Sequence, residues 1–250
     1  MAFRTFHIDD KPAEAPEQVQ RKKQKALIGG SLEMRRAHGQ ALGLQGQFLL
    51  DPIFRQEDEE RLRAACAADP DRPLTIEIGF QMGEFAVAFC LREPQRRYVG
   101  FEVRKKFCEE THAALEAAGV QNALICLVDA REMLSLVLRP GSLDELLVFF
   151  PDPWWKPRHV KKRLLTAEFI ADAARYLRPG GRLLLKTDVT EYADWAEELM
   201  RADPHYSVSR LEDPAADLPF TLRERRCRLH GYPTWAVQAL RNTVDVATLP

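Results

Sequence analysis

A single aspartate, Asp152, stands between two prolines where an apolar run of the chain ends. The run covers residues 146–150 and has the composition of a buried strand. Because proline has no backbone N–H and a fixed φ, it cannot continue a sheet ladder, so the strand must stop at Pro151. The sequence therefore predicts a carboxylate held rigidly at the end of a strand, with the aromatic side chain of Trp154 close behind it.

A dense group of basic residues follows this aspartate, and two further groups occur elsewhere. The net charge is only −1, so positive charge is concentrated locally rather than spread over the protein. The three groups cover residues 21–25, 156–163 and 223–228. One such group is typical of a solvated helix face, whereas three beside aromatic residues and a rigid carboxylate favour contact with nucleic-acid phosphates. The candidates in the middle group are Lys156, Arg158, His159, Lys161, Lys162 and Arg163.

Carboxylates stand at or beside the ends of five strands that the apolar pattern predicts. An acid at such a place can simply cap the following helix, where the helix dipole favours it. In a parallel sheet, however, the carboxyl ends of the strands form the side on which ligands bind. A polar ligand with several hydroxyl and amino groups accounts better for the whole set, which is Glu77, Glu102, Asp129, Asp152 and Asp188.

The first predicted strand runs into a turn with two glycines, Gly79 and Gly83. Their spacing differs from the G-x-G-x-x-G fingerprint, which disfavours a nicotinamide-dependent enzyme. Glu102, which ends the second predicted strand, has the position of a carboxylate that accepts from ribose hydroxyls. Asp129 and Ala130, at the end of the third predicted strand, are then expected near an adenine.

Strand and helix patterns alternate over most of the chain. Strands are expected over 74–78, 97–102, 123–128, 145–150 and 182–186, with two closing strands over 206–211 and 234–240. Helices are expected over 57–67, 84–91, 104–118, 132–138, 164–176 and 191–200. Such a series implies an α/β fold, with a mostly parallel sheet, right-handed crossovers and helices on both faces. Residues 1–50 are expected to form a partly disordered arm with a short helix near 33–42, and residues 51–250 the folded domain.

The composition is that of a globular protein, with 250 residues of which 46% are hydrophobic. No apolar run approaches the roughly 20 residues that span a bilayer, and no secretory signal follows the N-terminus, which favours the cytoplasm. The five cysteines are scattered without metal-ligand spacing, so buried reduced thiols and no metal site are expected. A monomer and a homodimer are both compatible with the sequence.

Several short motifs occur in order along the chain. They are Glu-Ile-Gly-Phe-x-x-Gly, Gly100-Phe101-Glu102, Asp129-Ala130, Phe-Pro-Asp-Pro-Trp with its basic tail, Lys186-Thr187-Asp188 and Thr221-Leu222-Arg223-Glu224-Arg225. With these motifs the chain resembles the bacterial tRNA (guanine-N7)-methyltransferase family over roughly residues 70–241. The Pro-Asp-Pro-Trp block is highly specific, whereas the glycine turn is not. The resemblance implies a class I, Rossmann-like methyltransferase fold, in which a seven-stranded sheet has an antiparallel last strand.

The same resemblance implies a function and a set of site residues. It implies methyl transfer from S-adenosylmethionine to N7 of a guanine in the variable loop of tRNA. It places the methyl donor at Glu77, Glu102, Asp129 and Asp152, with Asp152 as the catalytic residue. Gly79, Gly83 and Ala130, at the same strand ends, are expected to contact the donor as well. It places the substrate at Lys156, Asp188, Thr221, Arg223 and Glu224, and it assigns residues 158–163 to tRNA contact.

The chemistry of N7 methylation limits what the protein must supply. Guanine N7 carries a lone pair and no proton, so the reaction needs alignment of the reactants rather than a general base. A fixed carboxylate, Asp152, would stabilise the positive charge that moves onto the guanine ring. An arginine bound to N7 and O6 would cover the reacting atom. We therefore expect the N1–H and N2–H₂ donors of guanine to be held by a carboxylate, either Asp188 or Glu224.

One position departs from the pattern of the family, because Gln81 stands where glycine is usual. Its side chain is expected to crowd the methionine part of the donor, or to force a costly backbone conformation if φ is positive. A catalytically altered paralogue and a non-catalytic tRNA-binding protein are therefore alternatives. The basic groups disfavour a methyltransferase for proteins or small molecules, and the lack of a G-x-S-x-G sequence disfavours a serine hydrolase.

Overall fold

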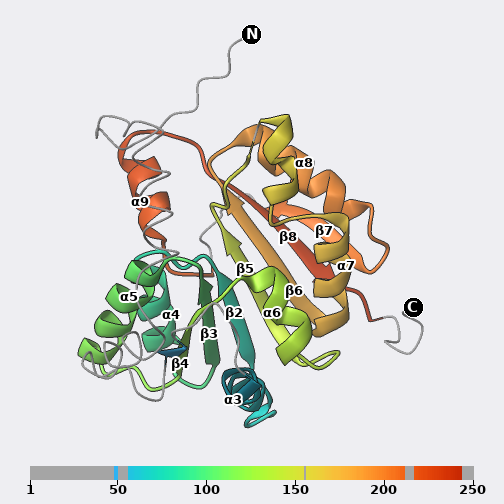
Figure 1. The fold of residues 1–250 in the computed structure, drawn as a ribbon. Helices are drawn as coiled ribbons and strands as arrows, with labels where there is room; N and C mark the ends of the chain where they lie inside the picture. The colour runs from blue at the N-terminus through green and yellow to red at the C-terminus, as the bar shows by residue number, and fades with distance from the viewer. Residues whose placement is uncertain (1–47, 50–55, 155, 212–216, 244–250) are drawn as a thin grey trace. The chain divides into compact units, whose positions relative to one another are not determined.

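The computed structural model describes residues 48–49, 56–154, 156–211 and 217–243. These residues form an eight-stranded sheet with the order β1-β4-β3-β2-β5-β6-β8-β7 (Figure 1). The strands are β1 (Phe48–Leu49), β2 (Leu74–Ile78), β3 (Arg97–Glu102), β4 (Ala123–Leu127), β5 (Leu143–Phe149), β6 (Leu177–Thr187), β7 (Tyr206–Leu211) and β8 (Trp235–Arg241).

The seven strands expected from the sequence are confirmed as β2 to β8. Only β8 runs against its neighbours, and it lies between β6 and β7. β6 begins earlier than expected because Leu177 pairs with Leu143, with an irregularity before regular pairing resumes at Arg182. β1 adds a short parallel strand beside β4, within the segment expected to be an arm. The rest of that arm and the helix expected near 33–42 lie outside the described residues.

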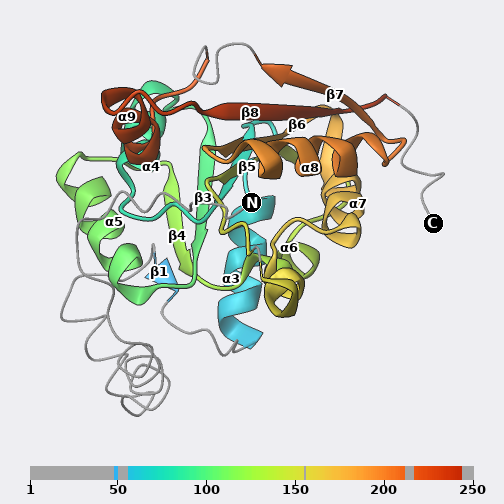
Figure 2. The same cartoon turned by 90° about the horizontal axis from the view of Figure 1, so that it is seen from above.

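Helices cover both faces of the sheet (Figure 2). They are α3 (Gln56–Ala67), α4 (Glu84–Arg92), α5 (Lys105–Ala117), α6 (Ala130–Val137), α7 (Ala167–Tyr176), α8 (Thr190–Arg201) and α9 (Leu222–Leu229), with a 3₁₀ helix η1 (Pro157–Lys162). Side chains of α3, α6, α7 and α8 share one hydrophobic core, and those of α4 and α5 share the other. The helices expected over 57–67, 84–91, 104–118, 132–138, 164–176 and 191–200 correspond to α3–α8, whereas α9 and η1 were not expected.

The central strand β5 shows why the apolar pattern succeeds. Its residues alternate between the two cores, with Leu146 and Val148 in one and Leu147 and Phe149 in the other. Because both faces are buried here, the strand is apolar at every position from residue 146 to residue 149, as is usual for the middle of a parallel sheet. Since β2 to β6 run parallel, their carboxyl ends lie at one edge of the sheet.

The cysteines are buried and carry free thiols, as expected. No three His, Cys, Asp or Glu side chains come together as a metal site would require, within the described ranges. Likewise, none of the helices that the structure describes is both long enough and apolar enough to cross a membrane.

Candidate active site

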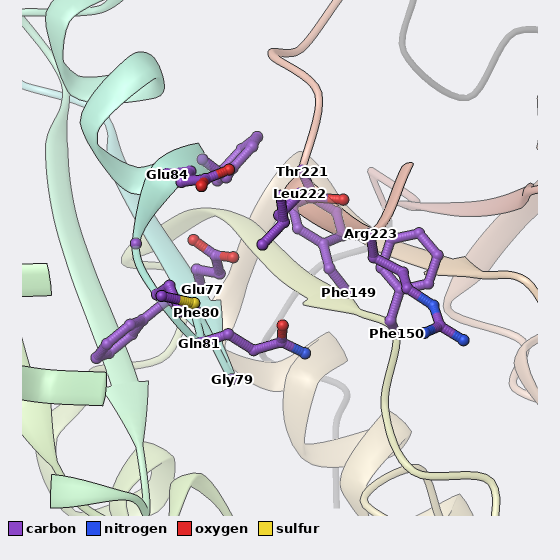
Figure 3. A pocket seen from close by; sticks show the side chains of 13 residues that line it. Glu77, Gly79, Phe80, Gln81, Glu84, Phe149, Phe150, Thr221, Leu222 and Arg223 are labelled. Carbon is purple, nitrogen blue, oxygen red and sulfur yellow. The ribbon is translucent and has the colours of Figure 1, made fainter. Parts of the chain in front are cut away.

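A pocket opens at the carboxyl edge of the sheet. The space between its lining residues measures about 370 Å³ with open solvent included. Three segments far apart in sequence form its walls, namely the turn from β2 to α4, the end of β5 and the start of α9. Figure 3 shows the β2–α4 turn on one side and the other two segments facing it. The lining residues are Glu77, residues 79–85, Phe149, Phe150, Thr221, Leu222 and Arg223.

Glu77 is the buried carboxyl group of this pocket, with 2% of its surface exposed. The Tyr98 hydroxyl donates to its Oε2, while Oε1 has no hydrogen-bond partner among the described residues. Burial raises the pKa of Glu77 to about 8, although the Tyr98 hydrogen bond and the charge of Lys186 act in the opposite direction. Glu77 is thus a carboxyl group that a bound cation would stabilise in its ionised form.

The β2–α4 turn depends on left-handed backbone at three positions. Gly79 has φ 81° and Gly83 has φ 73°. A side chain at Gly83 would collide with Thr111, whereas a Cβ at Gly79 would meet no atom within 4 Å. The space beside Gly79 is therefore open to a ligand, and Gly83 lets α4 pack closely on α5. The third position is Gln81, with φ 51°, which confirms the costly backbone conformation considered from the sequence.

Glu102 and Asp129 end the next two strands along the same edge. Glu102 is 4% exposed, and its Oε1 accepts from the backbone N–H groups of Val103 and Arg104 at 2.9 and 3.0 Å. Asp129 caps α6, and its carboxylate is held by the guanidinium of Arg131. That hydrogen bond lowers the pKa of Asp129. Both carboxylates are fixed in place, but neither lines the pocket around Glu77, and the buried Ala130 does not line it either.

Asp152 is exposed and lies in the loop that leaves β5, whereas its neighbours Pro151 and Pro153 are half-buried. Phe150 before it and Trp154 after it have φ values of 50° and 44°. Residues other than glycine rarely adopt this backbone region, so the surrounding contacts must hold the loop in place. The Phe150 N–H donates to the Lys186 carbonyl at 2.7 Å. The guanidinium of Arg163 donates to the Pro153 carbonyl at 2.9 Å.

The basic segment 156–163 forms η1 and its flanks, directly after this loop. Lys156, Arg158, Lys161 and Lys162 are exposed, which suits contact with a polyanion. The half-buried His159 packs edge-on against Trp154, and Lys162 lies over the same ring at 5.1 Å. Arg163 differs from its neighbours, because it packs over Trp195 at 4.6 Å besides holding Pro153. Arg163 therefore anchors the Asp152 loop.

The start of α9 is tied to the end of β6 by two ion pairs. A capping box links Thr221 and Glu224, whose Oε2 accepts from the Thr221 N–H at 2.7 Å. The Oε1 of Glu224 binds Lys186 Nζ at 2.8 Å, and both side chains are almost fully buried. Arg223 donates to Asp188 Oδ2 at 2.6 Å, and Asp188 remains half-buried. Both carboxylates considered for guanine are thus already partnered, Glu224 through both oxygens.

The structure brings together part of the residue set expected from the sequence. Glu77, Gly79, Gly83, Thr221 and Arg223 line one pocket. The other expected residues lie outside its lining, namely Glu102, Asp129, Ala130, Asp152, Lys156, Arg158, His159, Lys161, Lys162, Arg163, Asp188 and Glu224.

Sequence reasoning gave no role to three groups of the site, namely Lys186, Tyr98 and the pair Phe149–Phe150. A lysine within an apolar strand was the available signal for Lys186, since a buried lysine needs an anionic partner. For Tyr98 and the phenylalanines, nothing in their local sequence distinguishes them from ordinary core residues.

Comparisons with known proteins agree on a methyltransferase family. A family model described as "Putative methyltransferase" matches residues 71–237. A tRNA (guanine-N(7)-)-methyltransferase of Cutibacterium acnes is 40% identical over 132 residues, which are 53% of this chain and 48% of that protein. One of Pseudomonas putida is 34% identical over 168 residues, which are 65% of this chain and 70% of that protein. The chain thus spans about half the length of the Cutibacterium relative that it matches.

The fold is also shared with solved structures. A protein described as an antibiotic related methyltransferase superposes with a TM-score of 0.50 at 13% identity, covering 74% of this chain and 94% of that chain. At this identity the likeness concerns the fold alone. Together with the strand order, it confirms the expected class I, Rossmann-like methyltransferase fold.

Proposed function

The chain belongs to the tRNA (guanine-N(7)-)-methyltransferase family, and from this premise we propose that it transfers a methyl group from S-adenosylmethionine to N7 of a guanine in tRNA. One observation carries the proposal. The pocket joins a buried carboxyl group and an open glycine turn to the Thr221–Arg223 segment, and the basic segment follows Asp152 in the loop after the adjacent strand β5. Donor, base and tRNA backbone could thus be held at one edge of the sheet.

The residues present fit the methyl donor on two counts. Gly79 leaves open space beside the pocket where a side chain would stand, so a ligand can approach the backbone there. Glu77 offers a buried carboxyl oxygen that no described residue occupies, and such a group suits a ligand ammonium. When bound, the donor supplies a methyl group on a positively charged sulfur.

Carboxylates at the ends of neighbouring strands would hold the different parts of the donor. Glu77 would accept from the ammonium of the methionine part, and the glycine turn would follow its chain. Glu102 would accept from the ribose hydroxyls, because its position at the end of β3 is the one that binds ribose in related folds. Asp129 and Ala130 would lie against the adenine, with Arg131 holding the Asp129 carboxylate in place.

Asp152 is the proposed catalytic residue, and its role is electrostatic. N7 has no proton to remove, so most of the rate gain should come from holding N7 in line with the methyl carbon. Positive charge moves onto the guanine ring during the reaction, and the Asp152 carboxylate would stabilise it. The contacts of Phe150 and Arg163 that hold the loop would keep this carboxylate in position.

The guanine would be held by its N1–H and N2–H₂ donors, which leaves N7 free to react. Asp188 is the better candidate acceptor, because Glu224 is 1% exposed and uses both oxygens within the protein. Thr221 and Arg223 would line the guanine side of the pocket.

The partner of the basic segment would be the tRNA backbone. Lys156, Arg158, His159, Lys161 and Lys162 would contact phosphates, and Arg163 would act through the Asp152 loop. The reaction as written needs no metal ion, because the nucleophile needs no activation. We place the protein in the cytoplasm, where such a substrate is found.

The test is incubation with labelled methyl donor and unmodified tRNA, followed by nucleoside analysis. Labelled 7-methylguanosine is the expected product. A catalytically altered paralogue would bind donor and tRNA without product, and a non-catalytic tRNA-binding protein would bind tRNA alone. Neither alternative is favoured, because the named relatives are methyltransferases. Labelled product at another base or atom would refute the proposal.

A further inference from the structure

Gln81 is held in a backbone conformation that costs free energy. Its φ of 51° lies in the left-handed region, which a residue with a Cβ rarely adopts. Glycine would relieve this cost, as it does at the two neighbouring left-handed positions, Gly79 and Gly83. Strained residues of this kind concentrate at ligand-binding sites, so the retained glutamine calls for a reason in its side chain.

The backbone of the turn fixes where that side chain points. The Thr111 hydroxyl donates to the Gln81 carbonyl at 3.2 Å, and Thr111 also packs against Gly83. Figure 3 shows the Gln81 side chain extending from the turn into the pocket, toward the wall that carries Phe150 and Arg223. No hydrogen bond reaches its amide from any residue that the structure describes.

The charged neighbours in the pocket already have tasks. Glu77 is a carboxyl group, which suits a cation. The Arg223 guanidinium donates to Asp188 through Nε at 3.1 Å and Nη2 at 2.6 Å. An amino-acid group in this pocket would present its ammonium to Glu77, and its carboxylate would then need a donor away from Glu77. The uncommitted amide of Gln81 can supply one.

We propose that the Gln81 side-chain amide donates a hydrogen bond to the α-carboxylate of the methyl donor while Glu77 accepts from its ammonium. This inference rests on the proposed function, since it concerns the same ligand. Gln81 is then a donor-binding residue that offsets the strain of its own backbone, rather than an obstruction. The two interpretations, a donor-binding side chain and an obstructing one, predict opposite effects of removing the side chain.

Two variants of Gln81 distinguish between these interpretations. Gln81→Gly removes both the amide and the strain, so it should weaken donor binding about tenfold or more without lowering the midpoint of thermal unfolding. Gln81→Glu keeps the size of the side chain but replaces the donor by a carboxylate, so it should weaken binding at least as much. If the side chain only obstructs the pocket, Gln81→Gly binds the donor more tightly and Gln81→Glu behaves like the wild type.

Asp69→Gly is the matched control, because Asp69 also has a positive φ, 48°, and does not line the pocket. It relieves strain elsewhere and should leave donor affinity unchanged.

The experiment is calorimetric titration of the full chain with S-adenosylmethionine and with its decarboxylated analogue. The wild type should bind the analogue more weakly, and the loss caused by Gln81→Gly should be much smaller for the analogue than for the donor. An equal loss for both ligands, or no loss for either, would overturn the inference while leaving the proposed function intact. No binding of either ligand by the folded wild type would instead remove the proposed function.

Discussion

Lys186 on β6 and Glu224 on α9 form an ion pair at 2.8 Å in which the side chains are 0% and 1% exposed. Burial lowers the pKa of Lys186, and the negative charge of Glu224 opposes that shift. Lys186 also lies over the Phe149 ring at 5.0 Å, so the pair joins the sheet, α9 and one wall of the pocket. Its stability depends on both charges being present.

Glu224→Ala should destabilise the protein by about 3–5 kcal/mol, because it leaves the Lys186 charge buried without a partner. It also removes the capping box at Thr221. The measurement is the free energy of unfolding in urea. Arg201→Ala is the control, since it breaks an exposed i,i+4 pair with Glu197 and should cost about 0.5 kcal/mol or less. Equal costs for the two variants would contradict the prediction.

The role proposed for Asp188 can be separated from that of Glu224 with a base analogue. Inosine lacks the N2 amino group, so wild-type kcat/KM should fall about tenfold or more when inosine replaces the methylated guanine. Asp188→Asn should lose activity on guanine and much of this discrimination, because its amide presents a donor where the site needs an acceptor.

Glu224→Gln is the comparison for this assignment. It should change stability more than discrimination, because both oxygens of Glu224 are engaged inside the protein. If Asp188→Asn still distinguished guanine from inosine and Glu224→Gln did not, the residue that holds guanine would be Glu224. Intact guanine methylation in both variants would remove it from both residues.

The parallel strands could be predicted from sequence because a strand buried on both faces is mostly apolar and ends near Pro, Gly or a charged residue. Parallel strands also place their last residues at one edge, so the acids at Glu77, Glu102 and Asp129 could be expected there. α9 was missed because five of its eight residues are charged, and only Glu224 and Cys227 are buried. The capping box Thr221-x-x-Glu224 was the signal that could have found it.

The contacts that distinguish one site residue from another could not be predicted. Glu224 and Asp188 look equally suited to guanine in the sequence, and only tertiary neighbours show that Lys186 engages the first. Arg163 looks like its basic neighbours, yet it holds the Pro153 carbonyl. The left-handed backbone at Phe150 and Trp154 has no signal in residue type, since neither is glycine or asparagine.

The basic segment should govern the salt dependence of tRNA binding. Each phosphate contact contributes about 0.7 to 0.9 to the slope of log K against log salt concentration. Lys161→Ala combined with Lys162→Ala should therefore flatten the slope by about 1.4 to 1.8 and leave donor affinity unchanged. The slope is measured by fluorescence titration of tRNA at several salt concentrations.

Two exposed arginines at the opposite edge, Arg139 and Arg178, provide the control for charge removal. Their double alanine variant should keep the wild-type slope. Equal flattening by both double variants would mean that the effect comes from net charge rather than from the basic segment. Arg163→Ala should differ from either, lowering kcat more than tRNA affinity, because it frees the Asp152 loop.

Glu77 should make folding stability depend on pH. Burial raises its pKa to about 8, Tyr98 and Lys186 oppose the shift, and Glu102 adds to it. An unfolded glutamate titrates near 4.3, so between about pH 4.3 and 8 the folded protein binds more protons than the unfolded chain. Stability from this group is therefore complete below about pH 4.3 and is lost as pH rises through about 8.

Glu77→Gln removes this titration while keeping the shape of the side chain. Between pH 5 and 9 the wild type should lose free energy of unfolding relative to Glu77→Gln, whereas Glu132→Gln, at an exposed position of α6, should run parallel to the wild type. Donor binding should lower the pKa of Glu77 again, because a ligand ammonium favours the ionised carboxylate. Calorimetry at pH 7 in buffers of different ionisation enthalpy should then show proton release on binding to the wild type and none on binding to Glu77→Gln. Equal proton release by both proteins would show that Glu77 does not meet the ammonium.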